Sequence, residues 1–342
     1  MKRLRQIGKD GTALIIVVAI VAVLTPLVIH YHSRAADKLR LAARTSRHSQ
    51  ALSLARCGVY LAWEALSKDN RPFFYLPHCN PEKPMLTEGR PTDLEKAYLW
   101  MDKSRDTPQS FENGTLQIFL DDDMGRLSLN RTQTNDLAAA IKSLGVTKIE
   151  TTDIFKDEKK VDRSREMAAA IIDWRDSNGS PEMGIGAEDR EYMSQEPPYR
   201  CRNAPFQSLG ELTLVRDFDP ETMKQFKLDQ VVTVFGPGFH VNANTASAIV
   251  LSALPGISTS GQKAEIIAEI QRNRPYRSLA ELRSAVTSVD STVWNQLFRR
   301  ITLNSNRYRI KVVGAANGVE ATVEAVLQKR GRDFLVLAWK ER

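Results

Sequence analysis

Carboxylates and an amide crowd into one stretch of the chain, between residues 173 and 189. Asp173, Asp176 and Asn178 come first, and Glu188 and Asp189 follow after glycine and proline turns. Hard oxygen ligands on a flexible loop suit Ca²⁺, with Asp176, Glu188 and Asp189 as the primary candidates and Asn178 and Asp173 as secondary ones. The spacing is not that of an EF-hand, because no Glu occupies the twelfth loop position counted from Asp176 and no glycine the sixth. A solvated acidic loop that caps the next helix is the alternative, but so long an excursion within a compact domain needs something to order it.

The remaining residues with catalytic potential form no recognisable set. No nucleophile, base and acid fall into a legible order, and no glycine-rich phosphate loop follows a strand. The histidines are scattered along the chain: His30, His32, His48, His78 and His240. The sequence therefore predicts no enzymatic activity.

An uncharged run near the N-terminus predicts a membrane anchor. The chain has 342 residues, 42% hydrophobic and 26% charged, which is typical of a folded protein of about two domains. Residues 12–29 would span about 27 Å as a helix, close to the hydrocarbon thickness of a bilayer. Four basic residues precede the run: Lys2, Arg3, Arg5 and Lys9. We expect a cytoplasmic N-terminus, one membrane pass and the bulk of the chain outside. A cleaved secretory signal and a plain signal anchor are the alternatives, although the run is longer than the apolar core of a cleaved signal and no Ala-x-Ala box follows it.

The junction between the basic leader and this run resembles the processing site of type IV prepilins. The leader ends in Gly11, directly before the apolar helix. The resemblance implies cleavage by a prepilin peptidase between Gly11 and Thr12, followed by N-methylation of Thr12. Most members of that family carry Glu at the fifth mature position, where this chain has Ile16. Since a buried Glu needs a positive partner, a subunit with Ile16 needs no such partner above it and suits the top of a filament.

Beyond the membrane, the pattern predicts an α+β fold. An apolar stripe with spacings of three and four indicates that the N-terminal helix continues and packs on a globular domain; its members are Leu52, Ala55, Val59, Ala62 and Leu66. Pro26 should kink the membrane part. Strands are expected at 115–120, 126–129, 308–313, 319–327 and 334–339, with turns at Asn317-Gly318 and Gly331. These strands bracket a long helical section, so we expect a small antiparallel sheet with a large inserted all-α domain.

The helical section contains an internal repeat. The stretch from Arg202 to Leu212 returns 70 residues later as Arg272 to Leu282. Upstream of each copy, asparagines at Asn130 and at Asn242 and Asn244 are interpreted as helix N-caps. Each copy is then a cluster of short helices, giving two related units of about 130–215 and 240–290.

The second unit resembles the helix-hairpin-helix (SAM-like) domain, which often binds DNA through backbone N–H groups at a Gly-hydrophobic-Gly turn. Here the turn reads Gly256-Ile257-Ser258, so the second glycine is missing and the nest for a phosphate is damaged. The net charge of +7 adds little, because four basic residues lie in the leader. A membrane-anchored DNA-binding protein of the competence type is the alternative function.

Nearly the whole chain resembles the K minor pseudopilin of type II secretion systems. The resemblance is carried, in order, by the leader and anchor, Asp123-x-Gly125-Arg126 with Leu129-Asn130, the Gly186-Ala187-Glu188-Asp189 segment, the two helical units and the terminal strands. It implies a leader at 1–11, a membrane helix at 12–29, a periplasmic helix at 30–68, a pilin-like domain at 69–129 and 304–342, and an inserted helical domain at 130–303.

The same resemblance implies the function. The protein would be an inner-membrane precursor that becomes the tip of the periplasmic pseudopilus, initiates its assembly and supports export of folded proteins across the outer membrane. The expected partners are the minor pseudopilins I and J and the prepilin peptidase, with no nucleic acid. Calcium binding is a property of that family, which adds support for the ligands named above. In an oxidising periplasm, a disulfide between Cys79 and Cys201 is one option, and Cys57 could replace either cysteine.

Overall fold

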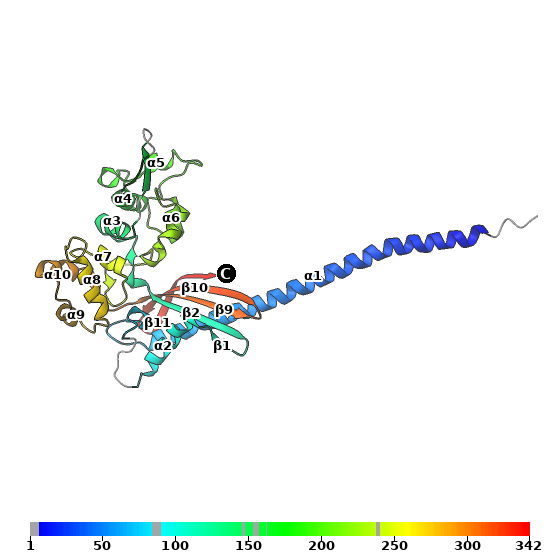
Figure 1. The fold of residues 1–342 in the computed structure, drawn as a ribbon, viewed down its shortest axis with the longest axis horizontal. Coiled ribbons are helices and arrows are strands. Elements are labelled where there is room, and N and C mark those ends of the chain that lie inside the picture. Colours follow the sequence, from blue (N-terminus) through cyan, green and yellow to red (C-terminus); the bar gives the residue numbers. More distant parts are fainter. Residues whose placement is uncertain (1–6, 84–89, 146–147, 153–156, 162, 237–239) are drawn as a thin grey trace, which may run out of the picture.

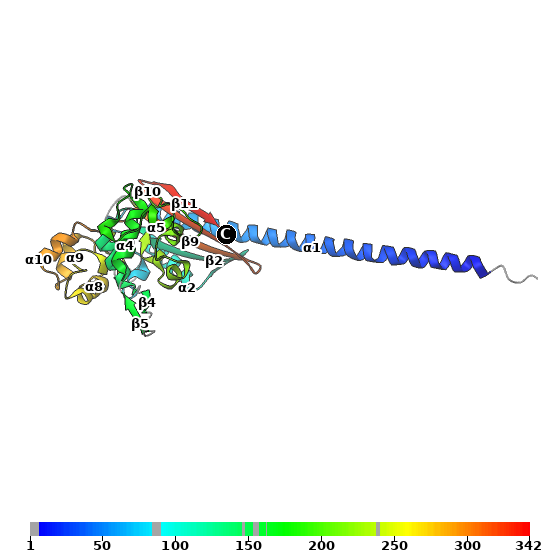
Figure 2. The same cartoon turned by 90° about the horizontal axis from the view of Figure 1, so that it is seen from above.

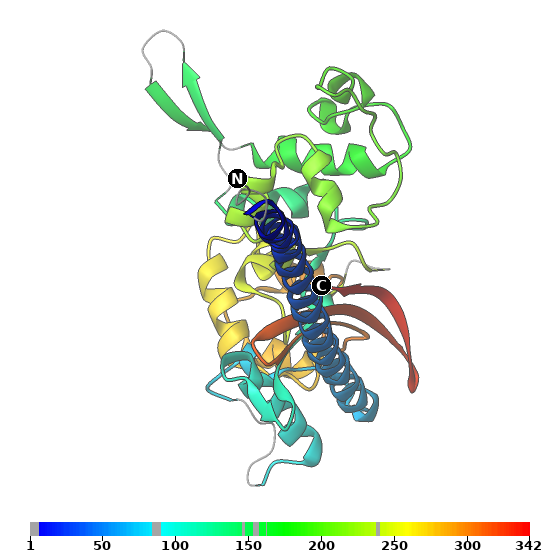
Figure 3. The same ribbon diagram turned by 90° about the vertical axis from the view of Figure 1, so that its right-hand side faces the viewer.

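A stem and a head make up the molecule. The computed structural model describes residues 7–83, 90–145, 148–152, 157–161, 163–236 and 240–342. The stem is a single helix, α1 (Ile7–Lys68), and the rest of the chain forms the head at its C-terminal end (Figure 1). The helix continues through Pro26 without interruption, so the proline does not divide it. Figure 3 shows that the head extends far wider than the stem.

The C-terminal part of α1 lies on a five-stranded antiparallel sheet. The strands are β1 (Gln109–Phe111), β2 (Gly114–Asp122), β9 (Arg307–Ala316), β10 (Val319–Arg330) and β11 (Asp333–Glu341), in the order β1-β2-β9-β10-β11. Of the predicted stripe on α1, Leu52 is half-buried and the other four residues are fully buried against the sheet. At Gly58, a Cβ atom would lie 2.6 Å from Cγ1 of Val312, so glycine permits the close approach of helix and strand.

A second helix completes this core. α2 (Asp93–Asp106) begins with a capping box between Thr92 and Glu95 and places Tyr98 and Met101 in the same cluster as α1 and the sheet. The predicted β-turn at Asn317-Gly318 joins β9 to β10, and both residues have the positive φ that a type I′ hairpin needs. The expected α+β class is confirmed, with a pilin-like helix and sheet on one side and a helical domain on the other.

The helical domain is inserted between β2 and β9 and has its own core. Its first unit contains α3 (Thr134–Ser143), α4 (Ser164–Arg175), α5 (Asp189–Tyr192) and α6 (Pro220–Gln225); its second contains α7 (Ala248–Ala253), α8 (Lys263–Arg272), α9 (Leu279–Ala285) and α10 (Ser291–Leu297). Five short 3₁₀ segments also occur in the described chain: η1 (Pro77–Cys79), η2 (Asp123–Gly125), η3 (Glu182–Gly184), η4 (Leu209–Leu214) and η5 (Leu228–Gln230). A hairpin of β4 (Lys148–Thr152) and β5 (Asp157–Val161), which the sequence did not predict, projects from the head (Figure 2).

The two units share a parallel strand pair that the sequence repeat did not predict. In each unit a short strand near its start pairs in parallel with one near its end: β3 (Leu127–Ser128) with β6 (Val232–Thr233), and β7 (Val241–Asn242) with β8 (Ile301–Thr302). Because β3 belongs to this pairing, the predicted strand at 126–129 lies in the helical domain and not in the large sheet.

The asparagines interpreted as N-caps have a different role. The amide of Asn130 donates to the carbonyl of Phe206 and accepts from its N–H, at 2.9 and 2.7 Å. Asn244 makes the same two bonds with Tyr276, at 3.0 and 2.8 Å. The nearby helices begin several residues later, α7 with Ser247 as its cap. The N-cap interpretation is therefore wrong. Each amide instead holds the backbone of one copy of the sequence repeat, at Phe206 or Tyr276, against the start of the same helical unit.

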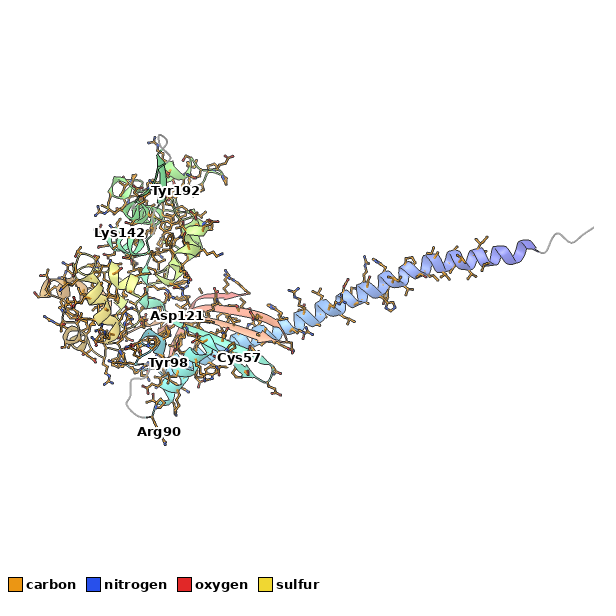
Figure 4. All side chains as sticks on the ribbon, viewed as in Figure 1. Cys57, Arg90, Tyr98, Asp121, Lys142 and Tyr192 are labelled. Carbon is orange, nitrogen blue, oxygen red and sulfur yellow. The ribbon has the colours of Figure 1, made fainter. Side chains whose placement is uncertain are left out.

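Three consecutive aspartates at the end of β2 join the two domains. Asp122 is fully enclosed and accepts hydrogen bonds from Asn242, Thr245 and Ser305. Asp123 accepts from Thr233 of β6, and its other oxygen pairs with Arg309 of β9. Figure 4 shows Asp121 at this boundary between sheet and helices.

Candidate functional site

The acidic stretch lies at the end of α4, in the first helical unit. Asp173 sits in the last turn of this helix and is completely buried. Its Oδ1 atom accepts a 2.8 Å hydrogen bond from the backbone N–H of Glu182. Its Oδ2 atom is buried and has no hydrogen-bond partner among the described residues. Gly186 passes so close to this oxygen that no Cβ could be accommodated, so the carboxylate is held tightly by the loop.

Glu188 provides a second buried carboxylate, close enough to Asp173 for their charges to interact, and these two side chains with their surroundings are called the acidic pocket below. Its side chain is 8% exposed, and Oε1 has no partner within the described part of the chain. Burial raises the pKa of Glu188 to about 7, and the negative charges of Asp173 and Asp176 add to this shift. Burial likewise raises the pKa of Asp173 to about 6, against the hydrogen bond from the backbone N–H of Glu182, which lowers it. Two enclosed carboxylates with unpaired oxygens form an electrostatic environment that favours a cation.

The other predicted ligands are less enclosed. Asp176 accepts from both the backbone and the side-chain N–H of Asn178, at 3.2 and 2.8 Å, so these two residues close their own turn. Asp189 accepts from the backbone N–H of Cys201 at 2.8 Å. Across the residues that the structure describes, no three His, Cys, Asp or Glu side chains converge as a ready metal cluster. The structure thus brings Asp173 and Glu188 together as a core and leaves the other three residues on its rim.

Residues that the sequence pattern did not single out hold this pocket in shape. Trp174 and Tyr192 pack edge to face at 5.2 Å, and Tyr192 lies fully buried in the first unit (Figure 4). Arg216 donates to the carbonyls of Gly186 and Ile185, at 3.1 and 2.7 Å. These contacts order the long loop partly without a metal. Nothing in the spacing of acidic residues points to Arg216, which lies far along the chain.

All three cysteines are free thiols in the structure. Cys201 is buried in the helical domain, where its thiol donates to the carbonyl of Asp173 at 3.3 Å. Cys79 packs against the core of the pilin-like domain, and Cys57 is exposed on α1. The predicted Cys79–Cys201 disulfide is therefore absent, because the two residues belong to the cores of different domains.

The membrane segment is fully exposed along the stem. Among the described residues, α1 is the one helix long and apolar enough to cross a membrane. Ile16, at the position where most prepilins carry Glu, is exposed on this helix. Gly11 and Thr12 lie in its first turns, outside the residues whose side chains the structure describes.

The turn between α7 and α8 is engaged in the protein's own packing. Gly256 adopts a positive φ of 87°, and a Cβ there would lie 3.0 Å from Val293 of α10. The backbone N–H of Ser258 donates to the carbonyl of Leu254 at 2.9 Å, and that of Ser260 to Ile257 at 3.1 Å. These N–H groups are unavailable to a phosphate, so the geometry at this turn gives no support to the DNA-binding alternative.

Comparison with known proteins finds similarity to one family. The family described as "Type II secretion system (T2SS), protein K" matches residues 152–237, which include the acidic pocket. The type II secretion system protein K of Pseudomonas aeruginosa is 25% identical over 96% of this chain and 95% of its own length. The protein of the same name from Klebsiella pneumoniae is 27% identical over 51% of this chain and 54% of its own.

A solved structure supports the same fold. A chain of the GspK-GspI-GspJ complex from the type II secretion system of enterotoxigenic Escherichia coli matches with a TM-score of 0.59 and 19% identity. The match covers 91% of this chain and 99% of that one. In its stem and sheet, its inserted helical units and these matches, the chain is similar to the type II secretion system protein K family.

Proposed function

We propose that this protein is the tip subunit of the type II secretion pseudopilus, where it initiates assembly and supports export of folded proteins across the outer membrane. The observation that carries the proposal is the shape of the molecule: a single apolar stem leads into a head much wider than the stem (Figure 3). Another subunit can pack its stem alongside from below, but the head obstructs addition from above. The role is structural and requires no catalysis.

The residue at position 16 supports the same placement. An acidic side chain in the apolar core of a filament would need a cation from the neighbour above it. Ile16 is apolar and makes no such demand. We further propose an inner-membrane precursor with a cytoplasmic N-terminus, cut between Gly11 and Thr12 and N-methylated on Thr12.

The partners proposed for this chain are the minor pseudopilins I and J. The solved structure that matches this fold is a chain from a complex of three such proteins. A head of two domains and an exposed stem leave ample surface for both partners.

Localisation and stoichiometry test the proposal. Pseudopili sheared from cells should carry this chain at one end, seen by gold labelling of an epitope on the head, and mass spectrometry should give N-methyl-Thr12 as the mature N-terminus. Label distributed along the filaments, or an intact Met1 in assembled material, would overturn it. A Gly11→Leu variant should remain uncut and fail to support secretion.

We also propose that the acidic pocket binds Ca²⁺. Asp173 and Glu188 would hold the ion, with Asp176, Asn178 and Asp189 available from the rim. The unpaired buried oxygens support this assignment, because each is an acceptor that lacks a donor in the described structure. Bound Ca²⁺ would neutralise the two charges and order the loop between α4 and α5. Calcium should therefore raise the melting temperature of the purified protein, and a chelator should lower it; an unchanged melting temperature would contradict the proposal.

A further inference from the structure

The part of the stem between the membrane run and the head is strongly basic. Between residues 30 and 50 the chain carries five Arg and Lys residues but only one acidic residue, Asp37. The basic residues are Arg34, Lys38, Arg40, Arg44 and Arg47. This stretch is exposed on α1 (Figure 4), so its charges are available to whatever lies beside the stem.

Three of these arginines line a hollow. Arg40, Arg44 and Arg47 are spaced by four and three residues, so they share one face of the helix. The hairpin turn between β9 and β10 overhangs this face and, with α1, encloses a groove of about 590 Å³, lined on the head side by Gly318, Val319 and Glu320. The groove therefore joins a cationic helix face to the edge of the head.

These guanidinium groups have little internal compensation. In the described chain, the one ion pair on this face joins Arg40 to Asp37 at 3.8 Å, and both side chains are more than 70% exposed. No ion pair within 4 Å joins Glu320 to the three arginines in the described residues, although it lines the same groove. Each guanidinium offers a planar fork of donors that suits a carboxylate.

The groove lies beyond the reach of lipid headgroups. Counting from Ile29, the last apolar residue, Arg40 is about 16 Å and Arg47 about 27 Å further along the helix axis at about 1.5 Å per residue. The headgroup layer extends only about 5–8 Å beyond the hydrocarbon. Arg34 and Lys38 are close enough to interact with lipid, but the three groove arginines face a protein environment when the stem stands upright.

We propose that this groove receives an acidic stretch of a different pseudopilin's stem. The inference rests on the proposed function, in which stems pack side by side. Packed helices lie about 8–10 Å apart, which is close to the Debye length of about 8 Å at physiological ionic strength. At that distance a second copy of this chain would bring three arginines against three arginines, whereas an acidic stem would pair with them. The same face thus favours a heterologous neighbour and disfavours self-association.

Charge reversal in the full-length protein tests the inference. A triple variant, Arg40→Glu, Arg44→Glu and Arg47→Glu, is co-expressed with the I and J pseudopilins and extracted in detergent. Association measured across a sodium chloride series should fall at least about tenfold at low salt for the variant, because attraction is replaced by repulsion. Wild-type association should weaken as salt is added, whereas association of the variant should strengthen, because salt screens the repulsion that replaces the attraction.

A matched control separates the groove from the general charge of the stem. The double variant Arg34→Glu and Lys38→Glu changes basic residues of the same helix outside the groove and should associate within about twofold of wild type, since exposed charges away from the contact contribute little. Equal association by wild type and the triple variant would overturn the inference alone. Failure of wild type to associate with either partner would overturn the proposed partners as well.

A lipid alternative is resolved by the same proteins in nanodiscs. If the triple variant loses association only in discs containing phosphatidylglycerol, and not in discs of phosphatidylcholine alone, then anionic lipid and not an acidic stem occupies the groove, and the inference is wrong.

Discussion

Replacing Asp173 by Asn distinguishes a metal-binding pocket from one that only supports the fold. The two interpretations predict opposite signs for the change in stability that the variant shows in the absence of metal. In the structure, one oxygen of Asp173 accepts from the backbone of Glu182 and the other is buried without a partner. Asn keeps the first bond through its carbonyl and replaces the unpaired anionic oxygen by an NH₂ group. That group faces the pocket that also contains the carboxylate of Glu188.

The expected magnitude follows from burial. Leaving a buried polar or charged group unpaired costs about 1–3 kcal/mol. In the presence of a chelator, Asp173→Asn should therefore be more stable than wild type by about 1–3 kcal/mol. In calcium at about 100 times the dissociation constant, wild type should gain about 2.7 kcal/mol of unfolding free energy, and the variant should gain almost nothing. With calcium, wild type should therefore become as stable as the variant or more stable.

Chemical denaturation of the full-length protein in detergent, followed by tryptophan fluorescence, measures both differences. Trp174, next to Asp173 and buried, reports on the first helical unit directly. Asp219→Asn is the control: Asp219 caps α6 on the surface and Asn caps as well, so stability should change by less than about 0.5 kcal/mol and the calcium response should persist. A variant that is less stable than wild type in chelator, or that keeps the full calcium response, would refute the reasoning.

Other contacts give sharp expectations. Asp122→Asn should lower the free energy of unfolding by about 2–4 kcal/mol in urea titrations, because the new NH₂ group faces the Asn242 donor. The control, Asp121→Asn, should lower it by less than about 1 kcal/mol, because the ion pair of Asp121 with Arg105 is half-exposed. Asn244→Ala should cost about 2–4 kcal/mol by orphaning two backbone groups, and a loss below about 1 kcal/mol would contradict this role of its amide. For His78, burial lowers the pKa, but a 2.9 Å hydrogen bond with Asp102 and the Cys79 thiol raise it to about 9. This pair therefore stabilises fully below pH 6.5, and about 1–2 kcal/mol should disappear as the pH rises through 9, a loss that His78→Gln should abolish.

Periodicity predicted those elements whose side chains face one uniform surface. The stripe on α1 was recognisable because a helix packed on a sheet must bury residues at spacings of three and four, and Ala55, Val59, Ala62 and Leu66 are indeed fully buried. The hairpin at Asn317-Gly318 was equally legible, because few sequences favour positive φ at two successive positions.

The asparagines show where residue type is ambiguous. Asn caps helices and also bridges backbone segments, and both roles depend on the same amide. Only the three-dimensional structure brings Phe206 to Asn130 and Tyr276 to Asn244, across 76 and 32 residues. The repeat was visible in the sequence, but the interaction that repeats was not.

The sequence predicted the acidic residues of the pocket, but only their burial in the structure shows which of them form its centre. The sequence favoured Asp176, Glu188 and Asp189 as ligands and ranked Asn178 and Asp173 below them, whereas the structure buries Asp173 completely and leaves Asp176 partly exposed. The structure divides them, because Asp173 and Glu188 are buried while Asp176 and Asn178 hydrogen-bond to each other nearer the surface. Burial depends on contacts from distant segments such as Arg216, which no local pattern encodes.

The run Asp121-Asp122-Asp123 explains how a bulky head can act with its stem. Asp121 pairs with Arg105 of α2 at 3.0 Å, inside the pilin-like domain. Asp122 binds the second helical unit through Thr245, and Asp123 binds the first through Thr233. Asp121 and Asp122 lie on the strand, where successive side chains point in opposite directions, and Asp123 begins η2, so the three adjacent acids reach three different partners. Rotating the helical domain about the sheet would break contacts to both units at once. On the proposed function, a push delivered along the stem would therefore move the whole head.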